Sequence, residues 1–253
     1  MTAADAVLDR RGHEGSFELA PVAKLFVGLT AMIAIEEGSL DLDAPAGRDG
    51  STVLHLLAHA SGLAFDSDRR LAAVGARRVY SNTGIETYAA HLEERTGMPY
   101  REYLRLGVVE PLELAETMLH GSPAADMRST VDDVSVLARE FLRPTLVSEE
   151  TLRMARTPVF AGLSGVLPGI GSFDPNPFGP AMEVKGDKSL HWSGTLTSAE
   201  TFGHFGGAGT FLWVDPVAGI ATVALTDRTF GGWAMRAWPE FSDLVVRTHG
   251  SGT

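Results

Sequence analysis

The sequence contains no cysteine, and lysine is almost as scarce, with three residues in 253. The absence of cysteine excludes structural disulfides, thiolate metal sites and a cysteine nucleophile. The 32 acidic residues outnumber the 21 basic ones, and no basic cluster occurs along the chain. This charge balance argues against nucleic acid or an anionic membrane as a partner.

Long apolar runs are also missing, because no stretch approaches the roughly 20 apolar residues of a membrane span. The first residues, MTAADAVLDRR, carry acidic side chains and no long apolar core, unlike a signal peptide. We therefore expect a cytoplasmic protein. What the chain does have is 44% hydrophobic residues, enough to fill a substantial core.

Apolar residues at helical spacing predict a long helix from Val22 to Glu37, with Pro21 at its first position and Gly38 after its end. Weaker helical patterns follow along the chain. They lie at 51–59, 83–96, 99–106, 130–142 and, as a final amphipathic helix, from Trp233 to Arg247.

Two β-rich runs at 209–216 and 219–227 predict a hairpin. Short extended pieces are expected at 4–10 and 15–20. Residues 157–200 are rich in Gly, Pro, Asn and Ser, which favours ordered loops and turns.

This order of elements predicts an α+β fold in which the sheet is assembled from both ends of the chain and a helical region is inserted between them. We expect residues 1–253 to form a single domain of two lobes. The α/β lobe would comprise approximately 1–45 and 157–253, and the helical lobe approximately 46–156.

Seven stretches in a fixed order resemble the serine β-lactamase and penicillin-binding-protein family, in particular its class C-like branch of DD-peptidases and esterases. The resemblance implies an antiparallel sheet flanked by helices, with an inserted helical region. The stretches are FELAPVAKLF with EEGSLDLDAP, TVLHLLAHASGL, YSNTG, VVEPLELAET, RSTVDDVSVLAREF and FGHFGGAGTFLWVDP.

In that family three motifs meet in a cleft between the lobes: Ser-x-x-Lys at the start of a long helix, Tyr-x-Asn on a loop, and Lys/His-x-Gly on an edge strand. Tyr80-Ser81-Asn82 fits the second motif and His204-Phe205-Gly206 fits the third. The first motif is broken, since LAPVAK places Lys24 on the lysine and Pro21 on the nucleophilic serine.

No shift of the alignment restores the serine. The residues three positions before Lys24, Lys185 and Lys188 are proline, methionine and lysine. Pro21 also lacks the backbone N–H that the resemblance assigns to the oxyanion hole. The resemblance therefore implies a family fold without its acyl-enzyme mechanism.

Family members usually have a first strand, and often a helix, before the segment that matches residues 4–12. Only a few residues precede that segment here. We expect either a sheet that lacks this strand, or a strand supplied by a partner or by a different start site.

The resemblance gives Lys24, Tyr80 and His204 as catalytic candidates. The substrate-binding candidates are Pro21, Asn82, Phe205, Gly206 and Gly207. For each polar candidate a plainer interpretation stays open. Lys24 could be a relic amine paired with a carboxylate or tyrosine, and Tyr80 could simply close a pocket.

Other side chains have weaker claims to a site. Ser16, Ser81 and Ser193 are possible substitute nucleophiles, although surface serines are the preferred interpretation for all three. His55 and His59 share a helix face but lack the third ligand of a metal site, so we expect no metal and no cofactor. Most of a nearby aromatic group is expected in the core rather than in a ligand wall: Trp192, Phe202, Phe205, Phe211 and Trp213.

Three functions remain in competition. The first is acid/base chemistry without a covalent intermediate, such as isomerisation, elimination or cyclisation of a small organic metabolite. The second is a pseudoenzyme that binds a metabolite or a protein. The third is a hydrolase that uses another serine. The oligomeric state cannot be predicted from these patterns.

Overall fold

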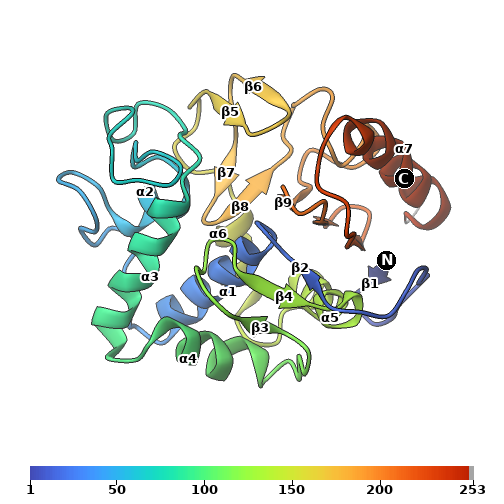
Figure 1. Cartoon of the computed structure of the whole chain (residues 1–253), viewed down its shortest axis with the longest axis horizontal. Helices are drawn as coiled ribbons and strands as arrows, with labels where there is room; N and C mark the ends of the chain where they lie inside the picture. The colour runs from blue at the N-terminus through green and yellow to red at the C-terminus, as the bar shows by residue number, and fades with distance from the viewer. Residues whose placement is uncertain (251–253) are drawn as a thin grey trace.

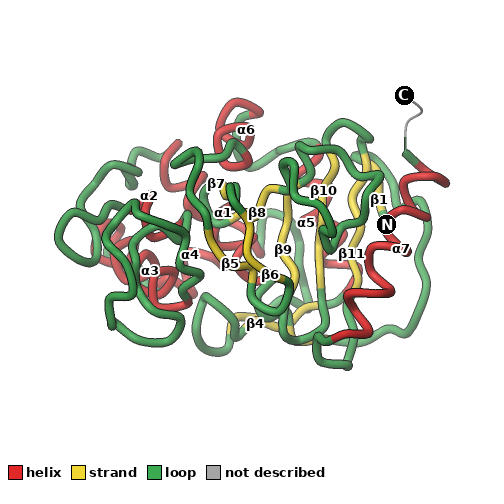
Figure 2. The backbone as a smooth tube through the Cα atoms, turned by 90° about the horizontal axis from the view of Figure 1, so that it is seen from above, coloured by secondary structure: helices red, strands yellow, loops and turns green. Residues whose placement is uncertain are grey.

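The computed structural model describes residues 1–250, and a six-stranded antiparallel sheet forms its centre (Figure 2). The strands follow the order β1-β11-β10-β9-β8-β7. Their bounds in that order are Thr2–Ala3, Ile220–Ala224, Phe211–Asp215, Phe202–Phe205, Met182–Val184 and Phe178–Gly179.

Each face of the sheet packs against helices, because side chains alternate along the strands. Leu212 and Val214 of β10 belong to the core shared with α1 (Ala23–Glu36) and α5 (Val131–Leu142). Phe211 and Trp213 point to the opposite face and pack with Trp238 of α7 (Gly232–His249). Figure 1 shows α7 at one side of the molecule and α1 near its middle.

The remaining helices lie mostly away from α7, with α2 and α3 at the opposite end of the molecule, on the left of Figure 1. They are α2 (Val53–Leu57), α3 (Asn82–Thr96), α4 (Tyr100–Leu104) with a π-helical turn at Arg105–Val109, and α6 (Glu149–Arg156). No helix within residues 1–250 is long and apolar enough to cross a membrane.

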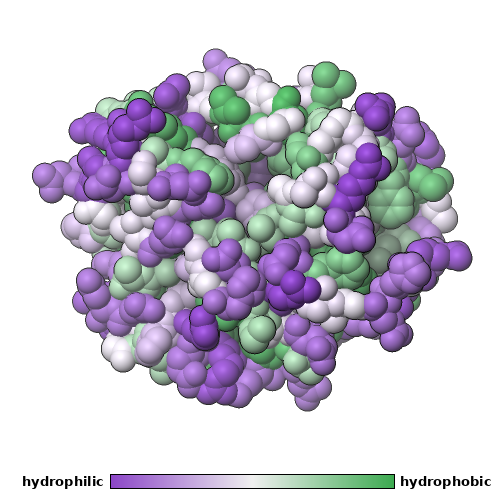
Figure 3. Space-filling view, in the orientation of Figure 1, coloured by the Kyte–Doolittle hydropathy of each residue, from purple (hydrophilic) through white to green (hydrophobic). Residues whose placement is uncertain are grey.

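Two small sheets complete the fold. One has the order β2-β4-β3, and the other is the hairpin of β5 and β6. Their bounds are Phe17–Glu18 for β2, Met118–Leu119 for β3, Met127–Ser129 for β4, Gly165–Leu167 for β5 and Gly171–Phe173 for β6. On the face shown in Figure 3, hydrophilic residues are most prominent along the left and lower edges, and hydrophobic residues are visible along the upper and right edges.

The α+β fold predicted from the sequence is confirmed. The long helix begins at Ala23, so Pro21 lies in the preceding turn, where its carbonyl accepts a hydrogen bond from the Lys24 N–H at 2.9 Å. The hairpin of β10 and β11 lies where it was predicted. Helix α6 was not predicted, and four short strands, β5 to β8, interrupt the expected loop region 157–200.

Three expectations about strands differ from the structure. Strand β9, which carries the His204 motif, lies between β8 and β10 and is not an edge strand. The extended piece expected at 4–10 is absent, and a strand of two residues, Thr2–Ala3, pairs with β11 instead. The first strand is therefore present in short form. The proposed division into two lobes remains a prediction, and α5, placed in the helical lobe, packs on the main sheet.

Candidate functional site

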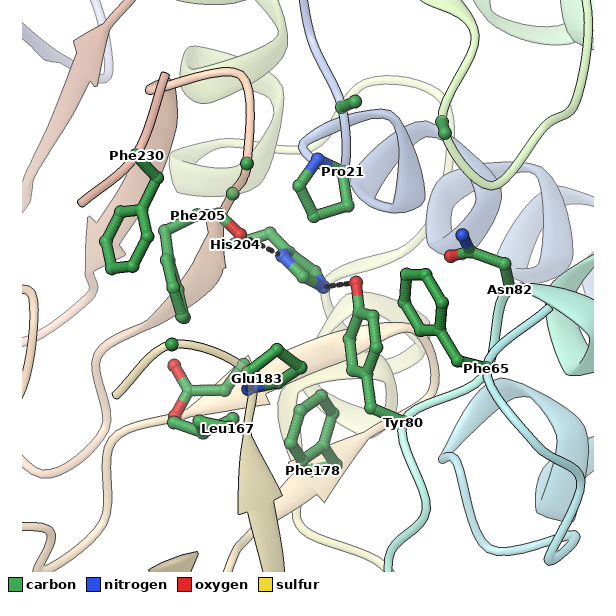
Figure 4. A pocket seen from close by; sticks show the side chains of 16 residues that line it. Pro21, Phe65, Tyr80, Asn82, Leu167, Phe178, Glu183, His204, Phe205 and Phe230 are labelled. Carbon is green, nitrogen blue, oxygen red and sulfur yellow. Dashed lines mark hydrogen bonds between the residues drawn. The ribbon is translucent and has the colours of Figure 1, made fainter. Parts of the chain in front are cut away.

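A cavity of about 350 Å³ lies where the turn before α1, the loop before α3 and strands β7 to β9 meet. Aromatic side chains form much of its wall, and Figure 4 shows them around the opening. They are Phe65, Tyr80, Phe178, Phe205 and Phe230. Every predicted site residue lies in this wall except Lys24: Pro21, Tyr80, Asn82, His204, Phe205, Gly206 and Gly207.

Lys24 is fully buried and does not line the cavity, but it contacts Asn82, which does. Its Nζ donates to Asn82 Oδ1 at 2.7 Å and to the Ala124 carbonyl at 2.8 Å, and lies 4.8 Å from the centre of the Tyr80 ring. Burial lowers the pKa of the amine to about 7, with partial opposition from the charges of Glu86 and Asp66. Lys24 therefore changes its charge close to neutral pH.

Tyr80 and His204 form a neutral hydrogen-bonded pair in the cavity wall (Figure 4). His204 Nδ1 lies 3.0 Å from the Phe205 carbonyl, which only accepts, so Nδ1 carries the proton. Nε2 then accepts from the Tyr80 hydroxyl at 3.2 Å. Burial lowers the pKa of His204 to about 3 and raises that of Tyr80 well above its usual value. Both side chains therefore stay uncharged at neutral pH.

Pro21 packs tightly against Gly206, which leaves no room for a side chain on Gly206. A β-carbon placed on Gly206 would lie 1.4 Å from Pro21 Cδ and 2.6 Å from the Ala20 carbonyl, so only glycine fits. The Gly206 N–H is used by the Thr210 carbonyl at 2.9 Å. In the described part of the chain, the N–H of Gly207 next to it has no backbone acceptor. Pro21 and Gly207 both line this wall of the cavity.

Asn82 connects the cavity to the buried amine. Its Oδ1 accepts from Lys24, and its Nδ2 donates to Asp66 Oδ1 at 3.2 Å. Asn82 is also the first residue of α3. The side chain is thus held in one orientation from both ends.

Two of the three candidate serines are buried and hydrogen-bonded. Ser81 is fully buried at the N-terminus of α3, where its hydroxyl accepts from the Gly84 N–H at 2.9 Å and donates to the Ala64 carbonyl at 2.6 Å. Ser193 is equally buried and lies 2.7 Å from His191 Nδ1. The prediction of surface serines was wrong for these two, and holds for Ser16, which is exposed.

His55 and His59 have separate partners. His55 stacks on Phe160 and bonds to Thr52, whereas His59 is buried and accepts from the Ser81 N–H at 3.2 Å. Within residues 1–250 no group of three or more His, Cys, Asp or Glu side chains could hold a metal ion.

Sequence reasoning missed Glu183, a buried carboxylate in the cavity wall. Glu183 forms an ion pair with Lys188 and accepts from Trp192 Nε1 at 3.0 Å, and its two oxygens lie 3.0 Å from His191 Nε2. The charges of His191 and Lys188 lower its pKa against the effect of burial. The one sequence feature that could have indicated Glu183 is its position as a single acidic residue in the stretch AMEVKG.

The aromatic residues around the third motif divide as expected. Phe205 lines the cavity, while the others belong to the cores of the sheet: Trp192, Phe202, Phe211 and Trp213. Phe65, Phe178 and Phe230 of the cavity wall were not predicted. They come from loops and a short strand that carry no motif.

Known proteins resemble the chain over nearly its whole length. A β-lactamase from Mycobacterium bovis is 45% identical, with a TM-score of 0.96 over 98% of this chain and 93% of that one. EstCE1, a hydrolase with promiscuous acyltransferase activity, has 21% identity and a TM-score of 0.76 over 94% of this chain and 86% of that one. The second likeness shows the fold alone.

A β-lactamase of Escherichia coli K12 is 23% identical over 54% of this chain, which spans 50% of that relative. The family model named Beta-lactamase matches residues 13–246. The chain belongs to the β-lactamase family.

Proposed function

We propose that this β-lactamase-family chain does not form an acyl-enzyme and instead transfers protons on a small organic molecule in the cavity. The observation that carries the proposal is Lys24, a buried amine with a pKa of about 7 that is bonded to the wall residue Asn82. A base with a pKa near the working pH is the most effective general base. We place this chemistry in cytoplasmic small-molecule metabolism.

The roles follow from the protonation states. Neutral Lys24 would accept a proton from a carbon next to a carbonyl group after the Asn82 side chain has moved aside, because Lys24 itself does not line the cavity. The Tyr80 hydroxyl would leave His204 and donate to the carbonyl oxygen as negative charge develops there. Return of the proton from Lys24 to another carbon of the conjugated enol, with the hydroxyl proton passing back from the oxygen to Tyr80, completes an isomerisation and restores both side chains. His204 would then hold the Tyr80 hydroxyl in place between turnovers.

Hydrogen exchange tests the proposal without knowledge of the substrate. In D₂O, the wild-type protein should speed the exchange of α-hydrogens in neutral aryl ketones, measured by proton NMR. The rate should rise with pH through about 7 as Lys24 loses its proton. Lys24→Met should abolish the effect, and Tyr80→Phe should lower it by about 10²-fold.

The control is Tyr88→Phe, which removes a buried hydroxyl that does not line the cavity and should leave exchange unchanged. Equal exchange rates with wild-type protein, with Lys24→Met and without protein would eliminate proton transfer.

A second candidate is binding without turnover, and the position of Lys24 favours it. Because Lys24 does not line the cavity, a bound molecule would meet Tyr80, Asn82 and His204 first. A ligand that raises the melting temperature equally in wild type and Lys24→Met, with no product, would support this function.

Covalent labelling tests the third function, a hydrolase that uses another serine, against the proposal. Because Ser81 and Ser193 are buried and hydrogen-bonded, the wild-type protein should take up no fluorophosphonate or penicillin label. Intact-mass spectrometry after an overnight incubation measures this. An adduct mapped by peptide sequencing to any serine would restore the hydrolase.

A further inference from the structure

A second cavity of about 640 Å³ adjoins the first, and Phe65, Tyr80 and Pro168 form the wall that they share. Its other walls come from the segment Arg77 to Val79 and from the β5–β6 hairpin. Since the two cavities share three residues, one ligand of sufficient length could occupy both.

Arg78 lines this second cavity as a buried charge without a carboxylate partner in residues 1–250. Its Nε and Nη1 donate to the carbonyls of Asn176 and Ala58, each at 2.7 Å, and its Nη2 donates to Val159. Carbonyls satisfy the hydrogen bonds of a guanidinium but do not neutralise its charge. Buried charges in proteins are usually paired with an opposite charge.

Asp187 lies with Arg78 in the wall of a third cavity, but within residues 1–250 it forms no ion pair with Arg78. Burial lowers the pKa of the nearby Lys188, and the charge of Arg78 adds to this effect. Glu183 is already paired with Lys188. Arg78 also lies 5.6 Å from the centre of the Phe178 ring, in the wall of the first cavity. Arg78 therefore contributes a positive charge near both cavities.

Arg77 supplies a free guanidinium at the same cavity. The side chain is exposed, and its Nη2 has one long contact, at 3.5 Å, with the Leu71 carbonyl. Asp174 lines the cavity too, but forms no ion pair with either arginine within the described chain. Two arginines and one aspartate leave an excess of one positive charge.

We propose that the second cavity binds the carboxylate end of the ligand through Arg77, while the first, aromatic cavity holds its apolar end. Arginine suits a carboxylate because its planar fork can donate two parallel hydrogen bonds. The inference deepens the proposed function by giving its substrate class: an aryl compound whose chain ends in a carboxylate.

Binding of simple probes tests this directly. The probes are 3-phenylpropanoate, 5-phenylpentanoate and their primary amides, measured by isothermal titration calorimetry at low salt. For wild type, the longer acid should bind at least about tenfold more tightly than its amide, because only the acid pairs with Arg77. The preference should shrink as salt is added.

Arg77→Gln should reduce the preference for the acid to less than about threefold and leave amide binding unchanged. Arg69→Gln, a change in the same exposed loop but outside both cavities, is the matched control and should keep the full preference. Equal affinity for acid and amide in wild type, or a preference that survives Arg77→Gln, would overturn the proposal.

The result is separable from the proposed proton transfer, because affinity is measured without turnover. Loss of the carboxylate preference with intact ketone exchange would remove only this inference. A retained preference without any exchange would remove only the catalytic proposal and leave a binding protein.

Discussion

The Pro21→Ser variant is expected to hydrolyse p-nitrophenyl acetate and nitrocefin at least ~10³ times faster than the wild-type protein. The change would restore a hydroxyl and a backbone N–H at one position of the cavity wall. Lys24 follows one turn later, and the Gly207 N–H beside Gly206 has no backbone acceptor among residues 1–250. Serine is smaller than the proline ring, so the tight contact with Gly206 does not oppose it.

The absorbance of the hydrolysis products measures the gain in rate. Intact-mass spectrometry detects the acyl-enzyme. Pro21→Ala is the matched control, because alanine restores the N–H without the hydroxyl and should stay inactive. The double variant Pro21→Ser with Lys24→Met should lose most of the gained activity. A serine variant as inert as the alanine variant would show that the remaining motif residues are not arranged for acyl transfer.

The second large expected effect is a pH dependence of the free energy of unfolding that comes from Lys24. The pKa of Lys24 falls from 10.5 to about 7 on folding, so the unfolded chain binds more protons than the folded one between these values. The free energy of unfolding should therefore rise with pH across this window. Lys24 alone would add about 3 kcal/mol between pH 7 and 9.5, and nothing further below its folded pKa.

Urea unfolding at a series of pH values measures this contribution as the difference between wild type and Lys24→Met. Lys24→Gln serves as a second variant that keeps polar atoms but does not titrate. Both variants should lack the rise. If Lys24→Met followed the same pH curve as wild type, the amine would not be held neutral by burial.

Much of the fold could be predicted because its signals are local. The apolar spacing of α1 and the β-rich runs of β10 and β11 identify these elements within a few residues. The meeting of Tyr80, Asn82 and His204 around Pro21 followed from the resemblance, since the residues lie far apart in the sequence. No local sequence pattern could have shown that these four residues lie close together in the structure.

What could not be predicted depends on tertiary contacts. Strands β5 to β8 are two or three residues long and exist only because neighbouring strands pair with them. Ser193 looks like a surface serine in a Gly- and Ser-rich segment, but the segment folds inwards and bonds it to His191. The unpaired charge of Arg78 becomes visible only when its carbonyl partners are placed around it.

Arg78 also has a consequence for the order of folding. Its three carbonyl partners lie 20, 81 and 98 residues away along the chain. Each bond closes a loop of the chain. Closing a loop costs conformational entropy before its contacts can stabilise the structure. The guanidinium can reach all three carbonyls only after the helical segments and β7 have come together. The walls of both cavities should thus be among the last parts of the molecule to form.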